Sequence, residues 1–284
     1  MNPSVPGRPH WWQWPTILSL DAPAVALAWQ WLLARTAHVA LGWPQMAVLG
    51  ASVWLAYAAD RWIEGWRLAP GQILTQRHHF YHRCRWPLAA LWIVILAIDL
   101  VIAARHLSGR EFAAGSMLLG PVLAYLLSHQ LVHRHHPARA PKEACVALLL
   151  AGGVAVFIVA RPGADLAALA GPLALFCLLC FANCALISGW ESHVDAAHGQ
   201  TSLALQSARA RALSRSLPWL LAAVSLVFAF IEHEPVRTAG LCAMAAGVLL
   251  GCVDRAEPAV GWQLARVLAD VALLTPLAPA LLRP

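Results

Sequence analysis

Long unbroken apolar runs constrain this chain more than any other feature. Two of the clearest cover residues 88–104 and 217–231, and neither shows the alternating polarity of a strand in a membrane barrel. Backbone groups in lipid must satisfy their hydrogen bonds internally, so such runs are predicted to be helices. Only 12% of the 284 residues are charged, about half the share in soluble proteins. The sequence therefore predicts an all-α, polytopic membrane protein and excludes a soluble enzyme.

The apolar runs divide the chain into about nine predicted spans, because a helix needs about 20 apolar residues to cross a bilayer. We expect these spans to surround a central cavity. They cover residues 17–35, 43–63, 86–104, 112–132, 143–160, 166–187, 215–231, 236–253 and 260–281. We expect a single transmembrane domain over residues 1–284. In it, helices 1–4 and helices 5–8 form a pseudo-repeat, and helix 9 is added at the end.

The basic residues indicate how the chain lies in the membrane. They are concentrated in the three long connections that follow spans two, four and six. Because Lys and Arg gather on the cytoplasmic side, we expect the N-terminus and these connections to be cytoplasmic in a bacterial-type inner membrane. The same rule explains the formal net charge of +6. No nucleic-acid-binding motif is present, so we expect lipid and no nucleic acid as partners; the oligomeric state is left open.

Two matched carboxylate pairs stand at the ends of predicted spans. Asp60 and Glu64 end the second span, and Glu191 and Asp195 follow the sixth. A spacing of four places both members of a pair on one helix face. Four spans separate the pairs, which places all four acids on the same side of the membrane. Such oxygen-rich sites suit Mg²⁺, which is often held by a few carboxylates plus substrate phosphates.

With these motifs at these positions, the chain resembles the UbiA superfamily of intramembrane prenyltransferases, nine-helix proteins with aspartate-rich motifs at the ends of helices two and six. The family motifs fall on residues 56–64 and 187–195. The chain departs from both motifs at the first acid, which is replaced by Tyr57 and by Ile187. The resemblance implies Mg²⁺-dependent transfer of a prenyl group from a prenyl diphosphate to an aromatic or lipid acceptor. The catalytic and metal-binding residues would be Asp60, Glu64, Glu191 and Asp195.

The resemblance also assigns residues to the substrates. Lys142 is the only lysine in the chain and falls near the basic residue that contacts diphosphate in the family; the alternative is a lysine that anchors a span end. Arg77 can grip a diphosphate as a fork, although positive charge on the cytoplasmic side explains it equally well. We also assign Arg139 to this substrate. Tyr57 and Asn183, one or two turns inside the acids, are assigned to the lipophilic acceptor.

Two alternatives stand beside this prediction. Histidines cluster in the cytoplasmic connections, and membrane di-iron oxidases and hydroxylases use histidine boxes. Here His129 and His133 fit one such box, but no complete second box is present. In that case the Fe ligands would be His78, His79, His82, His129, His133, His135 and His136. The other alternative is a non-catalytic membrane protein on the same fold.

Overall fold

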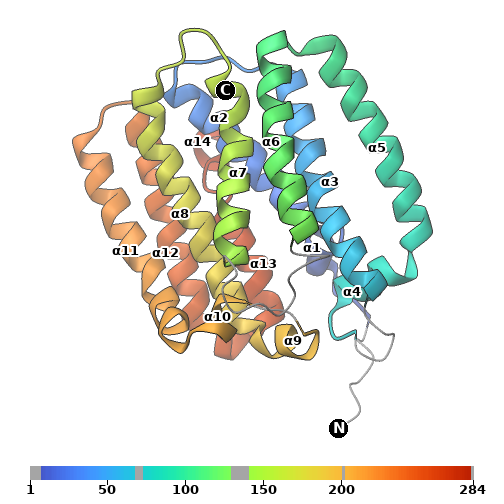
Figure 1. Cartoon of the computed structure of the whole chain (residues 1–284). Coiled ribbons are helices and arrows are strands. Elements are labelled where there is room, and N and C mark those ends of the chain that lie inside the picture. The colour runs from blue at the N-terminus through green and yellow to red at the C-terminus, as the bar shows by residue number, and fades with distance from the viewer. Residues whose placement is uncertain (1–7, 68–72, 129–140, 200–201, 283–284) are drawn as a thin grey trace.

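The computed structural model describes residues 8–67, 73–128, 141–199 and 202–282, and its regular structure over these residues is entirely helical. The long helices lie side by side in a bundle (Figure 1). They are α2 (Asp21–Thr36), α3 (Trp43–Arg67), α5 (Arg85–His106), α6 (Gly109–Leu127), α7 (Lys142–Val159), α8 (Leu166–Trp190), α11 (Ala208–Ile231) and α12 (Val236–Val260). The short helices are η1 (Trp11–Gln13), α1 (Trp14–Ile17), α4 (Gln76–Arg83), α9 (Ser192–Ala197), α10 (Leu203–Gln206), α13 (Trp262–Ala272) and α14 (Leu277–Leu282).

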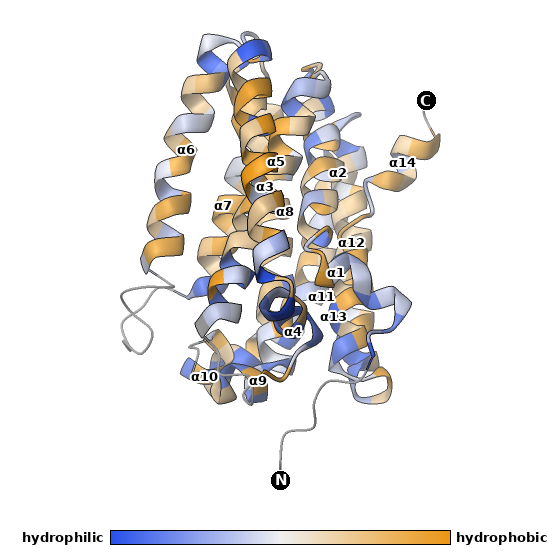
Figure 2. Ribbon diagram, turned by 90° about the vertical axis from the view of Figure 1, so that its right-hand side faces the viewer, coloured by the Kyte–Doolittle hydropathy of each residue, from blue (hydrophilic) through white to orange (hydrophobic). Residues whose placement is uncertain are grey.

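The prediction of an all-helical membrane protein is confirmed, whereas the number of nine spans is not. Among the described helices, α5, α7, α8, α11 and α12 are long and apolar enough to cross a membrane. A sixth span arises if η1 and α1 are counted together with α2, which is bent away from them by 74°. The ninth predicted span is divided between α13 and α14. Figure 2 shows apolar residues along the long helices and hydrophilic ones near α4 and α9.

A buried aromatic contact joins the elements that carry the polar interior of the bundle. Trp29 of α2 stacks on Phe176 of α8 with 4.8 Å between ring centroids, and neither side chain is exposed. The indole Nε1 of Trp29 donates to the carbonyl of Leu273, directly after α13, at 2.8 Å. A buried indole N–H requires such a partner. The contact therefore fixes α2, α8 and the end of α13 against one another.

Glycine allows α11 and α12 to pack closely. A Cβ added at Gly247 of α12 would lie 2.8 Å from the carbonyl oxygen of Pro218 and 3.0 Å from the backbone nitrogen of Ala222, both in α11. Because these are backbone atoms, they cannot turn aside as a flexible side chain would. Small residues allow this kind of close backbone approach between membrane helices.

We expect Gly247→Ala to lower the free energy of unfolding by about 1–3 kcal/mol, the range for overpacking a close contact. The matched control is Gly120→Ala in α6, because nothing lies within 4 Å of a Cβ at Gly120. In a helix interior, Ala is favoured over Gly by roughly 0.5–1 kcal/mol. Thermal unfolding of both variants in detergent measures the difference. Equal stability would contradict the packing of α11 on α12.

Candidate active-site cavity

A cavity of about 210 Å³ lies among α2, α3, α4, α6, α7, α8, α9 and α13. Seven of the 14 acids of the chain line it, together with four basic side chains. The acids are Asp21, Asp60, Glu64, Glu143, Glu191, Asp195 and Asp270, and the cations are Arg61, Arg77, Lys142 and Arg266. Ionisable groups among membrane helices are costly and mark functional sites. This concentration makes the cavity the candidate site.

The structure brings the two predicted carboxylate pairs together. Asp60 and Glu64 extend from α3, Glu191 stands between α8 and α9, and Asp195 lies on α9. All four line the one cavity. Of the predicted substrate-binding residues, Tyr57, Arg77, Lys142 and Asn183 also line it. Arg139 lies outside the described residues. The roles of all these residues in binding and catalysis stay predictions.

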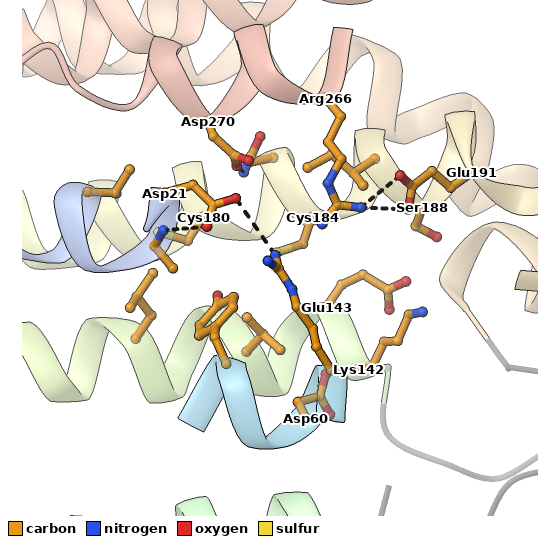
Figure 3. A pocket seen from close by; sticks show the side chains of 18 of the residues that line it. Asp21, Asp60, Lys142, Glu143, Cys180, Cys184, Ser188, Glu191, Arg266 and Asp270 are labelled. Atoms are coloured by element: carbon orange, nitrogen blue, oxygen red, sulfur yellow. Dashed lines mark hydrogen bonds and ion pairs between the residues drawn. The ribbon is translucent and has the colours of Figure 1, made fainter. Parts of the chain in front are cut away.

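Glu191 is held by two arginines. Arg266 Nη1 donates to both carboxylate oxygens of Glu191 at 2.7 Å, and the two side chains point toward each other in Figure 3. Arg77 donates to the same carboxylate at 3.0 and 3.3 Å. Burial lowers the pKa of Arg77, but the carboxylates of Glu191 and Glu64 outweigh it and leave the pKa above its usual value. Arg77 therefore stays charged.

The other acids near Glu191 also have partners. Lys142 Nζ lies 3.3 and 3.4 Å from the two carboxylate oxygens of Asp195. Glu64 accepts from Nε2 of His78 at 2.8 Å, and Nδ1 of His78 lies 2.7 Å from the Thr75 hydroxyl. Burial lowers the pKa of His78 to about 4, although its bond to Glu64 acts the other way. At neutral pH this contact is therefore a hydrogen bond from a neutral ring to a carboxylate.

These pairings bear on the predicted metals. Within the described ranges, no three His, Cys, Asp or Glu side chains are grouped so that they could hold a metal ion by themselves. The acids still supply the oxygen donors that Mg²⁺ prefers, and Mg²⁺ is commonly bound by one or two carboxylates plus substrate phosphates. The cavity therefore fits a Mg²⁺ ion that arrives with a diphosphate.

Of the seven histidines predicted as Fe ligands, three lie within the described residues, on α4. His78 is bonded to Glu64, and Nδ1 of His82 lies 3.1 Å from the carbonyl oxygen of Gly65. Four of the seven lie outside the described residues, namely His129, His133, His135 and His136. No described contact favours an iron site.

Arg266, Asp21 and Asp270 are among the charged cavity residues that were not assigned to the site from the sequence. Arg266 is the stronger partner of Glu191, and Asp21 and Asp270 both line the cavity. Asp270 also accepts from Nδ2 of Asn183 at 2.9 Å. The signal that could have found all three is an ionisable residue inside a predicted membrane span.

The comparisons with known proteins agree with this architecture. No protein-family model and no curated protein sequence matches the chain. In three dimensions, the chain is similar to the apo structure of a UbiA homolog from Aeropyrum pernix K1, with a TM-score of 0.60 and 16% sequence identity. The match covers 93% of this chain and 98% of that one. The chain is thus an integral membrane protein that shares its fold with this UbiA homolog.

Proposed function

We propose that this protein is an intramembrane prenyltransferase, which transfers a prenyl group from a prenyl diphosphate to an aromatic or lipid acceptor. One observation carries the proposal: a single cavity joins a cluster of acids and cations to apolar walls, within a UbiA-type fold. A prenyl diphosphate has the same two parts, an anionic head and an apolar tail.

The head group has three cationic partners in the cavity, Arg77, Lys142 and Arg266. Each is within hydrogen-bond distance of a carboxylate. A diphosphate can take over these contacts, because it offers several anionic oxygens to the same donors. Arg266 is prepared for this, since its Nε is buried and has no hydrogen-bond partner in the described part of the chain.

The tail would lie along the apolar walls of the cavity, which include Val25, Val146, Leu150 and Leu273. Breaking the allylic C–O bond leaves the electron pair with the diphosphate and a positive charge on the prenyl carbon. Water would capture that cation, so the walls must exclude it until the acceptor reacts.

Mg²⁺ enters the proposal as the ion that accompanies the diphosphate. Asp60, Glu64 and Asp195 would hold it, while Glu191 reaches it only by leaving Arg266 and Arg77. Bound there, Mg²⁺ would stabilise the charge on the leaving diphosphate. The excess of acids over cations around the cavity favours such a divalent ion. We also propose that this end of the bundle faces the cytoplasm of a bacterial-type inner membrane, following the distribution of basic residues.

The test is product formation in proteoliposomes. Purified protein is incubated with Mg²⁺, isotopically labelled prenyl diphosphates of several chain lengths and a panel of aromatic and lipid acceptors. We expect a labelled lipid product, and we expect Asp60→Asn to reduce its formation at least tenfold, because an ionic ligand is lost. The control is Asp165→Asn, since Asp165 caps α8 outside the cavity by accepting from the backbone nitrogen of Ala168 at 3.0 Å.

Two outcomes would count against the proposal. A folded protein that yields no product with any donor and acceptor would indicate a non-catalytic protein on this fold. Equal rates for Asp60→Asn and wild type would remove Asp60 from the site. Iron in the purified protein at one or two atoms per chain would instead support the histidine alternative.

A further inference from the structure

A second polar cluster lies in the same cavity, apart from the cations that face Glu191. It consists of Asp21 from α2, Asp270 from α13 and Asn183 from α8. Asn183 precedes Glu191 by eight residues of helix, which corresponds to roughly 12 Å at 1.5 Å per residue. In Figure 3, Asp21 and Asp270 lie on one side of the cavity, and Glu191 and Lys142 lie on the other. The two clusters therefore lie in different parts of the cavity.

The two carboxyl groups lie on the same side of the cavity. Oδ1 of Asp270 accepts from Nδ2 of Asn183 at 2.9 Å. An ionised carboxylate only accepts hydrogen bonds. The pair therefore offers acceptor oxygens to a ligand that donates a hydrogen bond, and carboxyl oxygens to a released proton.

The cluster also contains an acceptor atom that is not used. Oδ1 of Asn183 is buried and has no hydrogen-bond partner within the described ranges, and the whole residue is only 6% exposed. Leaving a buried acceptor unsatisfied costs about 1–3 kcal/mol. Because Asn183 lines the cavity, a ligand that donates a hydrogen bond there would satisfy it.

The nearby cation is already occupied. Arg61 lines the cavity and lies 3.7 Å from a carboxylate oxygen of Asp21. Its Nη1 donates to the carbonyl of Thr16 and, at 2.8 Å, to the hydroxyl of Ser19. The cluster therefore presents acids and an amide oxygen to a ligand. Its cation, Arg61, differs from the cations near Glu191 because a backbone carbonyl and a hydroxyl hold it in addition to a carboxylate.

We propose that Asp21, Asp270 and Asn183 form the acceptor subsite, and that it selects a neutral acceptor with a hydroxyl or N–H group over a carboxylate-bearing one. This inference rests on the proposed function and adds the acceptor class to it. The donor group of the acceptor binds Oδ1 of Asn183. On transfer, the C–O bond of the prenyl diphosphate breaks and the diphosphate leaves with the electron pair. The acceptor forms the new bond to the prenyl carbon and releases a proton, which the Asp21–Asp270 pair takes up.

The test compares two probes that differ in charge and have nearly the same shape, 4-hydroxybenzamide and 4-hydroxybenzoate. Their binding to the purified full-length protein is measured by calorimetry at pH 7, without a prenyl diphosphate. We expect the neutral amide to bind at least tenfold more tightly than the carboxylate. Asn183→Leu should weaken binding of the amide about tenfold, because the free oxygen is lost. The control is Ser225→Ala in α11, which removes a buried hydroxyl that lies outside the cavity and has no hydrogen-bond partner among the described residues.

Asp270→Asn is a second test variant, chosen because its effect on binding does not arise from unfolding. It removes one acid and keeps the shape, so the preference for the amide over the carboxylate should fall severalfold. Equal binding of both probes by the wild type, or an unchanged preference in Asp270→Asn, would overturn the inference. Because these measurements need no prenyl transfer, they distinguish this inference from the proposed function. Selective binding without transferase activity would support the acceptor subsite and count against the proposed function. Transferase activity without selective binding would overturn the acceptor subsite and leave the proposed function standing.

Discussion

Arg266→Gln is expected to weaken binding of a prenyl diphosphate by roughly 10–100-fold, the effect of losing charge-assisted hydrogen bonds. Two effects act in the same direction. The head group loses a donor, and Glu191 loses the partner that lies 2.7 Å from both of its oxygens. Glu191 would then depend on Arg77 alone and compete with the diphosphate for it. Calorimetry with an unreactive prenyl thiodiphosphate in detergent measures the change.

The matched control for Arg266 is Arg215→Gln. Arg215 also pairs with a buried carboxylate, that of Asp254, with Nε at 3.0 Å from Oδ2, but its side chain is 59% exposed and does not line the cavity. We expect the Arg215→Gln variant to bind the diphosphate as tightly as the wild type does. Arg266→Lys keeps the charge and should give an intermediate affinity. Wild-type affinity in a folded Arg266→Gln variant would rule out the cationic head-group site.

The meeting of the four acids in one cavity could be predicted from the sequence. The four-residue spacing of Asp60 and Glu64 fixes their common helix face, and the four spans between the two motifs fix the side of the membrane. Both arguments need only the spacing of residues along a helix and the even number of predicted spans between the motifs. The apolar runs of the sequence supply both. The all-helical membrane fold was predictable for the same reason, because lipid leaves few choices for the backbone.

The partners of the acids could not be predicted in this way. Arg266 meets Glu191 across 75 residues of chain, and the pairing depends on where α13 ends up in the bundle. The number of spans was also harder to predict. The apolar run at 260–281 is interrupted between α13 and α14, and hydropathy alone does not show that break.

The acids inside the predicted spans had no partner that the sequence could name. Asp99 of α5 accepts from the Ser52 hydroxyl of α3 at 2.9 Å, while Asp270 accepts from the Asn183 amide at 2.9 Å. A small polar residue such as Ser52 carries no pattern that distinguishes it from other serines. Contacts of this kind follow from tertiary packing, so they appear only once the helices are placed.

The second large effect is expected from Glu111→Ala, which should lower the free energy of unfolding by about 3 kcal/mol, at the lower end of the range for breaking a buried ion pair. Glu111 is only 1% exposed. Its carboxylate accepts from the Gln45 amide at 2.8 Å and from the Ser108 hydroxyl at 2.7 Å, and it lies 3.0 Å from Nε of Arg161. It thus joins the start of α3, the start of α6 and the segment after α7.

The size of this effect follows from what the substitution leaves behind. The amide of Gln45 would lose its acceptor, and Arg161, whose side chain is 36% exposed, would recover only part of its interaction from water. Chemical denaturation in detergent measures the loss, with Glu257→Ala as a control at a half-buried glutamate outside the cavity. The segment between α5 and α6, next to which Glu111 stands in the first turn of α6, lies at the opposite end of the bundle from α4 and α9 (Figure 1). Diphosphate binding should therefore stay unchanged wherever the variant is folded. A loss of affinity without a loss of stability would contradict a structural role for Glu111.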